Sequence, residues 1–180
     1  MIQTIRLDHL LREEVATPYR HLVTRRTGAA VRSGIERALA ASACHTALLD
    51  FTEVDLLDLS CADEIVAKLL MNPGPASERC VVLQGLREDQ LEAVEHVLNH
   101  HRLAVAAVLA DDAPPDLLGC ADDDARAAFA QVRNAGPTDV PSLAGALAWA
   151  EPRARAALDA LASLRLARFV DGLFHPVTVR

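Results

Sequence analysis

The chain has 180 residues, of which 51% are hydrophobic and 24% are charged. This composition is typical of a globular protein and excludes disorder over most of the chain. The net charge is -7, so the chain lacks the overall basic character of many nucleic-acid-binding proteins. Residues 133–180 are the exception, because six Arg there outnumber four acidic residues.

The cysteines, at positions 44, 61, 80 and 120, are widely spaced and form no Cys-x-x-Cys pair. This spacing favours free thiols in a reducing compartment over a disulfide framework or a zinc site. No N-terminal basic-then-apolar segment is seen, and no apolar run approaches the roughly 18 residues that span a bilayer. We therefore expect a cytoplasmic protein that does not enter a membrane.

The first two thirds of the chain alternate short apolar runs with segments of helical spacing. The predicted elements are, in chain order, an edge strand within 3–11, a helix at 27–40 with Thr27 as N-cap, a strand at 47–51, a helix at 60–71, a strand at 80–83, a helix at 87–100 and a strand at 103–109. Strands that alternate with helices of this length predict βαβ units and a sheet covered by helices.

The pattern changes after Asp111-Asp112-Ala113-Pro114-Pro115, which predicts a boundary between a domain at 1–112 and a second one at 116–180. Helical spacing in the second domain predicts helices at 122–133, 141–149 and 152–164, and Asp171-Gly172 predicts the type I′ turn of a tight hairpin within 168–175. Three helices followed by a hairpin are the element order of a winged helix.

One motif lies in the first domain, where Leu48-Leu49-Asp50-Phe51-Thr52-Glu53-Val54 precedes Asp58-Leu59-Ser60-Cys61-Ala62-Asp63-Glu64-Ile65. The stretch resembles the STAS family of anti-sigma-factor antagonists, in which a buried strand and a Val-containing turn lead to Asp-Ser-Ser-Gly at a helix start. Asp58 and Ser60 match that pattern, whereas Leu59 and Cys61 depart from it. The segment from Ala62 is more similar to a STAS-like branch of uncharacterised bacterial domains. The resemblance implies an α/β, STAS-like sheet with covering helices over about residues 20–110.

Ser60 has two interpretations. As an N-cap, its hydroxyl accepts a hydrogen bond from a free backbone N–H at the helix start. As a phosphoacceptor, which the resemblance implies, it would place a charge of about -1.5 to -2 at the positive end of the helix dipole and release a docked partner. Asp63 and Glu64 stabilise the first helical turn but would repel that phosphate, which argues against the switch.

Other candidate sites have simpler explanations. Glu92, His96 and His100 share one helix face, but they do not form a His-Glu-x-x-His metal motif, and a solvated face is the better interpretation. Arg25-Arg26-Thr27-Gly28 precedes a helix, where it could bind an anion or serve ordinary capping. The chain has no Walker lysine, no dinucleotide fingerprint and no nucleophile elbow. We expect no enzyme activity, no cofactor and no bound metal.

The C-terminal segment resembles bacterial winged-helix transcription regulators. The matching residues are Leu117-Leu118-Gly119 before the first helix, Leu143-Ala144-x-x-Leu147 at the turn unit, and Leu158, Leu161, Leu164 and Leu166, with Arg165 in place of the usual glycine. Helical geometry predicts that Ala154, Ala157, Leu158, Leu161 and Leu164 are buried, and that Arg155, Ala156, Asp159 and Ser163 face outward. The resemblance implies backbone contacts to DNA from Arg153, Arg155, Arg165 and Arg168, with Asp159 on the reading face.

The leading hypothesis is a bacterial regulator, mainly α in its winged-helix domain, that binds duplex DNA as a homodimer while the STAS-like domain senses a signal or dimerises. The alternative is an adaptor in a partner-switching pathway, in which both domains bind proteins and DNA is never contacted.

Overall fold

A computed structural model of the chain describes residues 1–72, 74 and 79–179. The strands are β1 (Ile2–Arg6), β2 (His21–Leu22), β3 (Thr46–Asp50), β4 (Leu56–Leu57), β5 (Cys80–Gln84), β6 (Ala104–Val108), β7 (Asp116–Gly119), β8 (Ala167–Val170) and β9 (Leu173–Pro176). The helices are α1 (Leu7–Val15), α2 (Arg25–Ala40), α3 (Leu59–Ala62), the π-helix η1 (Asp63–Ala67), α4 (Lys68–Met71), α5 (Glu88–His101), α6 (Asp123–Ala135), α7 (Val140–Leu147) and α8 (Glu151–Ser163).

The main sheet has five strands in the order β1-β3-β5-β6-β7. The first four are parallel, and β7 pairs antiparallel with β6 at the edge. Smaller pairs are formed by β2 with β4 and by β8 with β9. The fold is therefore mixed α/β with a mostly parallel sheet and several helices.

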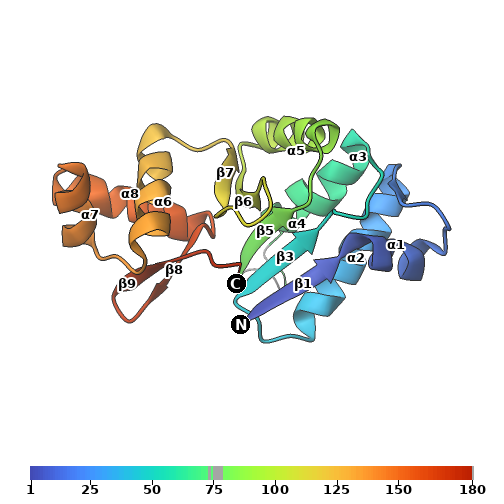
Figure 1. Ribbon diagram of the computed structural model, residues 1–180, viewed down its shortest axis with the longest axis horizontal. Helices are drawn as coiled ribbons and strands as arrows, with labels where there is room; N and C mark the ends of the chain where they lie inside the picture. The colour runs from blue at the N-terminus through green and yellow to red at the C-terminus, as the bar shows by residue number, and fades with distance from the viewer. Residues whose placement is uncertain (73, 75–78, 180) are drawn as a thin grey trace.

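The central strands are apolar along their whole length because both faces of the sheet are buried. Successive residues point to opposite faces, so Leu49 and Leu83 belong to one hydrophobic cluster, and Leu48 and Val82 belong to another. The first cluster joins the sheet to the helices between α1 and α5. These helices lie beside the sheet in Figure 1.

The second cluster joins the other face of the sheet to the C-terminal elements. Leu48, Val82 and Leu117 share it with Phe129 of α6 and Leu158 of α8. The three C-terminal helices and the β8–β9 hairpin gather at one end of the molecule, beyond β7 (Figure 1). The two parts of the chain are thus connected by a common hydrophobic cluster as well as by the covalent link.

The N-terminal elements differ from the sequence-based prediction. The expected strand within 3–11 ends at Arg6, and the helix α1 begins at Leu7. Its fully buried Leu7 and Leu11 are one helical turn apart, so helix formation buries both side chains. Helix α2 begins two residues before the predicted start, and Thr24 rather than Thr27 is its N-cap, accepting a hydrogen bond from the Thr27 N–H.

Strand β7 lies on the far side of the predicted domain boundary. Residues 116–119 were expected to lead into the first helix of the second domain, but they complete the sheet by pairing with β6. Whether residues 1–112 and 116–180 are separate folding units stays a prediction. Among the described residues, no helix is both long and apolar enough to cross a membrane.

Candidate functional site

Asp58, not Ser60, caps the helix that begins at Leu59. Its Oδ1 atom accepts a hydrogen bond from the Cys61 N–H at 2.8 Å. The interpretation of Ser60 as the N-cap is therefore wrong, because the helix starts one residue before it. Ser60 is half-buried, and within the described part of the chain its hydroxyl makes no hydrogen bond that would fix it.

The N-termini of α2 and α3 lie side by side. The second carboxylate oxygen of Asp58 accepts a hydrogen bond from the Thr24 N–H at 2.8 Å, and the Cys61 thiol donates to the Thr24 carbonyl at 3.0 Å. Thr24 has a φ of 73°, which is uncommon for a β-branched residue. These contacts hold Thr24 in a conformation that costs energy by itself.

Gly28 permits the close packing of these helices. A Cβ atom at Gly28 would lie 2.9 Å from both the Cα of Cys61 and the Cβ of Glu64. Burial raises the pKa of the Cys61 thiol to about 12, and the adjacent Asp58 carboxylate acts in the same direction. Cys61 is therefore a packed, protonated thiol rather than a nucleophile.

Asp63 and Glu64 form a network with basic side chains. The Arg25 guanidinium donates to Asp63 at 3.0 Å and to Glu64 at 3.1 Å, and His101 contacts Asp63 at 2.7 Å. Glu64, whose side chain is 3% exposed, also pairs with Lys68 and Arg32.

Ion pairing dominates the titration of both acids. Burial opposes ionisation of Asp63, but the bonds with His101 and Arg25 outweigh it and hold the pKa below its ordinary value. Burial opposes ionisation of Glu64 too, and Lys68, Arg25 and Arg32 together lower that pKa. The expected repulsion between these acids and a phosphate on Ser60 is thus offset by neighbouring cations.

Both acids of the network lie on the π-helix η1, which the sequence pattern does not predict. The Lys68 N–H bonds to the Asp63 carbonyl five residues earlier, so this turn is wider than an α-helical turn. Single π-turns inside helices are frequent at functional sites. The apolar residues of this segment follow regular helical spacing, which does not indicate the additional residue of a π-turn.

A cavity of about 230 Å³ lies beside Ser60. Its lining includes Arg25, Leu59, Asp63, His96, His100 and His101. His96, His100 and Glu92 are exposed, as expected for a solvated face. No group of three or more His, Cys, Asp or Glu side chains suited to a metal ion occurs among the described residues.

Large apolar side chains are exposed next to Ser60. Leu59 is 50% exposed, and Leu56 of β4 is 46% exposed. Val23 follows β2, which pairs with β4, and is 36% exposed. We call Val23, Leu56 and Leu59 the apolar rim of Ser60. Grouped exposed apolar residues are characteristic of binding surfaces.

The C-terminal helix α8 presents the predicted faces. Ala154, Ala157, Leu158 and Leu161 are buried, and Arg155, Ala156, Asp159 and Ser163 are exposed. Leu164, expected in the core, is half-buried and packs at its border. The outward surface of α8 is therefore accessible to a partner.

Two of the four arginines proposed as DNA contacts bond to groups within the chain. Arg153 donates to both oxygens of Asp124, at 2.8 and 2.6 Å, and its guanidinium lies 4.3 Å from the Trp149 ring centre. Arg165 is half-buried, and its guanidinium donates to the Leu70 carbonyl. Its φ of 60° is the left-handed conformation in which the related pattern has glycine.

Arg168 is half-buried on β8. Its positive charge is the largest influence that lowers the pKa of His45, the residue before β3. Arg155 is exposed, as Arg153 is, but unlike Arg153 it forms no ion pair with the described residues. The sequence identifies all four residues as cations, but it does not show which of them form contacts within the folded chain.

Comparison with known proteins finds no matching family model, no matching curated protein and no matching solved structure.

Proposed function

We propose that the chain is a regulatory protein whose C-terminal part is a winged helix that binds duplex DNA through α8. The order of α6, α7, α8 and the β8–β9 hairpin supports this interpretation. So does a β-bridge in which Thr138 and Phe174 exchange two backbone hydrogen bonds of 3.0 and 2.9 Å. The bridge attaches the hairpin to the segment before α7, which holds it beside the helices.

The exposed outward face of α8 is the main observation behind the proposal. A recognition helix enters the major groove with its N-terminal residues near the bases, and cations beside it position it on phosphates. Under this proposal Arg155 contacts a phosphate. Asp159, one turn later, can accept a hydrogen bond from cytosine N4. Of the two arginines on α8, Arg153 is paired with Asp124, and Arg155 lies one turn from the acidic Asp159. This arrangement implies weak binding with a shallow salt dependence.

Fluorescence anisotropy of the full chain with random duplex DNA at about 50 mM salt tests the proposal. Arg155→Ala should weaken binding and reduce the slope of log K against log salt by about one unit. Asp159→Asn should raise non-specific affinity, because it removes a charge that repels phosphates. Arg26→Ala is the matched control, since Arg26 is also exposed but lies on α2. Equal effects of Arg155→Ala and Arg26→Ala, or no binding by the wild type, would reject the DNA-binding role.

The apolar rim of Ser60 favours a second function, the adaptor of a partner-switching pathway. The STAS-like motif places Ser60 between Leu59 and the buried Cys61, and the pairing of Asp63 and Glu64 with cations reduces the repulsion of an added phosphate. A phosphate beside Leu59 would disturb an apolar contact with a partner protein.

Phosphopeptide mapping of the protein from its native cells tests the adaptor. Phosphate on Ser60 supports a switch at this position. Full coverage of the 59–72 region in several growth conditions with only unmodified Ser60 contradicts it. A Ser60→Asp variant that keeps wild-type DNA binding would further separate the two functions, because Ser60 is not on α8.

A further inference from the structure

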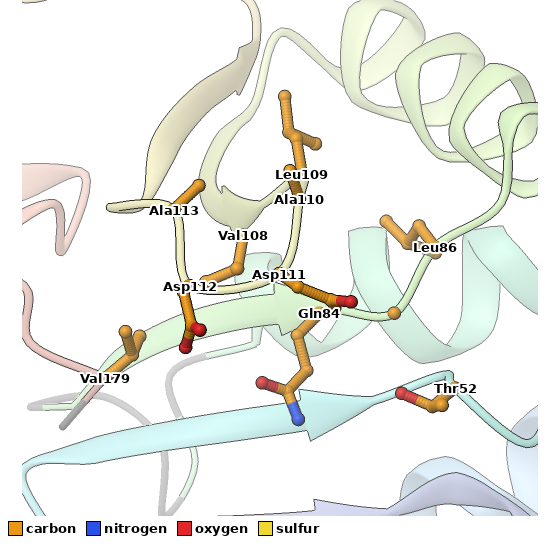
Figure 2. A pocket seen from close by; sticks show the side chains of 11 residues that line it. Thr52, Gln84, Leu86, Val108, Leu109, Ala110, Asp111, Asp112, Ala113 and Val179 are labelled. Carbon is orange, nitrogen blue, oxygen red and sulfur yellow. The ribbon is translucent and has the colours of Figure 1, made fainter.

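A second, larger cavity opens at the carboxyl ends of β3, β5 and β6. Its volume is about 460 Å³, within the range of small-molecule sites. Figure 2 shows Thr52 and Gln84 on the strand side of this cavity, with the loop containing Leu109, Ala110 and Asp111 on the other side. Ligands of parallel α/β sheets bind at this edge, because loops there can vary while the sheet holds them in place.

Gly85 shapes one wall of the cavity. Its φ is 71°, and a Cβ atom at this position would lie 2.3 Å from the Thr52 hydroxyl oxygen. A side chain at Gly85 would therefore disturb the close approach of the chain after β5 to the chain after β3. Because Gly85 has no side chain, Thr52 and Gln84 can line the same cavity.

The cavity offers hydrogen-bond acceptors. The Thr52 hydroxyl donates its proton to Asp50 Oδ1 at 2.6 Å. Toward a ligand this hydroxyl can therefore act only as a hydrogen-bond acceptor. Asp111 adds a carboxylate, and the Gln84 amide adds a carbonyl oxygen. The charged side chains among the described lining residues are acidic, and none is basic. The described lining residues offer an anionic ligand no opposite charge, and Asp111 would repel it.

We propose that this cavity binds a small organic cation, such as an amine or guanidine, whose N–H groups donate to Thr52, Gln84 and Asp111. An ammonium group that gives up part of its hydration shell requires acceptors and an opposite charge, and these side chains supply both.

The cavity also contacts the C-terminal tail. Val179 lines it, and Val177, two residues earlier, is buried in the cluster shared with α6 and α8. The tail follows β9 directly, so a bound cation would touch the segment that continues from the hairpin. The bound molecule would thereby act as the signal of the regulator; this regulatory role rests on the proposed function, whereas ligand binding itself does not.

A matched series of six-carbon compounds tests the site: 1,6-diaminohexane is a dication, 1,6-hexanediol is neutral and adipate is a dianion. Amide chemical shifts of the full chain are followed by NMR during each titration. The diamine should cause saturable shifts at Gln84–Leu86 and Leu109–Ala113, and adipate should cause none. Shifts spread over exposed acidic residues elsewhere, no saturation with the diamine, or stronger binding of adipate would overturn the proposal.

Asp111→Asn and Thr52→Val should each weaken diamine binding roughly tenfold, the order expected when a charge-assisted or neutral hydrogen bond is lost. Asp171→Asn removes an exposed carboxylate at the hairpin turn and should leave binding unchanged. Equal weakening by Asp111→Asn and Asp171→Asn would show only non-specific attraction to an acidic protein and would overturn the site. The titration is independent of DNA, so a failure of DNA binding leaves its result intact.

Discussion

Asp58 joins two helix N-termini, because one carboxylate oxygen accepts from the Cys61 N–H and the other from the Thr24 N–H, each at 2.8 Å. The first bond caps α3, and the second fixes the strained residue before α2. The segment around Ser60 therefore depends on a side chain that precedes it by two residues.

Asp58→Ala should lower the free energy of unfolding by about 1–3 kcal/mol, because it removes a cap and leaves the Thr24 N–H without its partner. Ser60→Ala should change it by less than about 0.5 kcal/mol, since Ser60 is not the cap. Urea denaturation of both variants gives the comparison. A larger loss for Ser60→Ala than for Asp58→Ala would contradict the assignment of the cap.

Replacing two helical glycines by alanine should change the stability of the protein in opposite directions. Gly28→Ala should destabilise the protein by about 1–3 kcal/mol, because the added methyl group overlaps Cys61 and Glu64. Gly145→Ala, in α7, meets open space and should stabilise it by about 0.5–1 kcal/mol through helix propensity. Thermal unfolding measures both. Equal stabilisation by the two changes would mean that α2 and α3 are not in close contact.

Glu64→Gln should lower stability at about pH 7 by about 1–3 kcal/mol, because three cations lose a buried partner. The pKa of Glu64 is lower in the folded state than its ordinary value of 4.5, so its contribution is complete above that value and is lost as the pH falls below it. The difference between wild type and variant should therefore shrink at about pH 3.5.

The control for this pH dependence is Glu95→Gln, because Glu95 is exposed on α5. Denaturation midpoints of the three proteins are measured across the same pH series. A difference between wild type and Glu64→Gln that stays constant with pH would show that the charge of Glu64 does not stabilise the fold.

Cys120 should be the cysteine that reacts in the native protein. It is exposed, whereas Cys44, Cys61 and Cys80 are buried. Burial also raises the pKa of Cys80 to about 11, which suppresses the reactive thiolate. Brief alkylation at about pH 8 followed by peptide mass spectrometry should find the label on Cys120. Comparable labelling of Cys61 before denaturation would contradict the packing of α3 against α2.

The sequence predicted the central strands and most helices because their residues are strongly periodic or uniformly apolar. The prediction was wrong where a short segment fits more than one kind of element. Residues 3–11 contain both a strand pattern and, from Leu7 to Leu11, the spacing of a buried helix face. The short strand β7 has little periodicity of its own, and its pairing with β6 depends on the folded sheet.

The candidate sites show the same limit. Asp58 and Ser60 are both good capping residues, and only the exact start of the helix decides between them. Arg165 contacts the carbonyl of a residue 95 positions earlier in the chain, which no local pattern could indicate. The sequence thus predicts candidate binding residues, while tertiary contacts determine which of them remain accessible.

The second hydrophobic cluster has a consequence for biosynthesis. Leu48, Val82 and Ala106 leave the ribosome well before Phe129, Leu158 and Val177, which share their cluster. A nascent chain that ends near residue 112 would have one sheet face covered by helices and the other apolar and open to water. Such intermediates are prone to aggregate, so the first two thirds of this protein should require a chaperone or rapid translation until the last residues emerge.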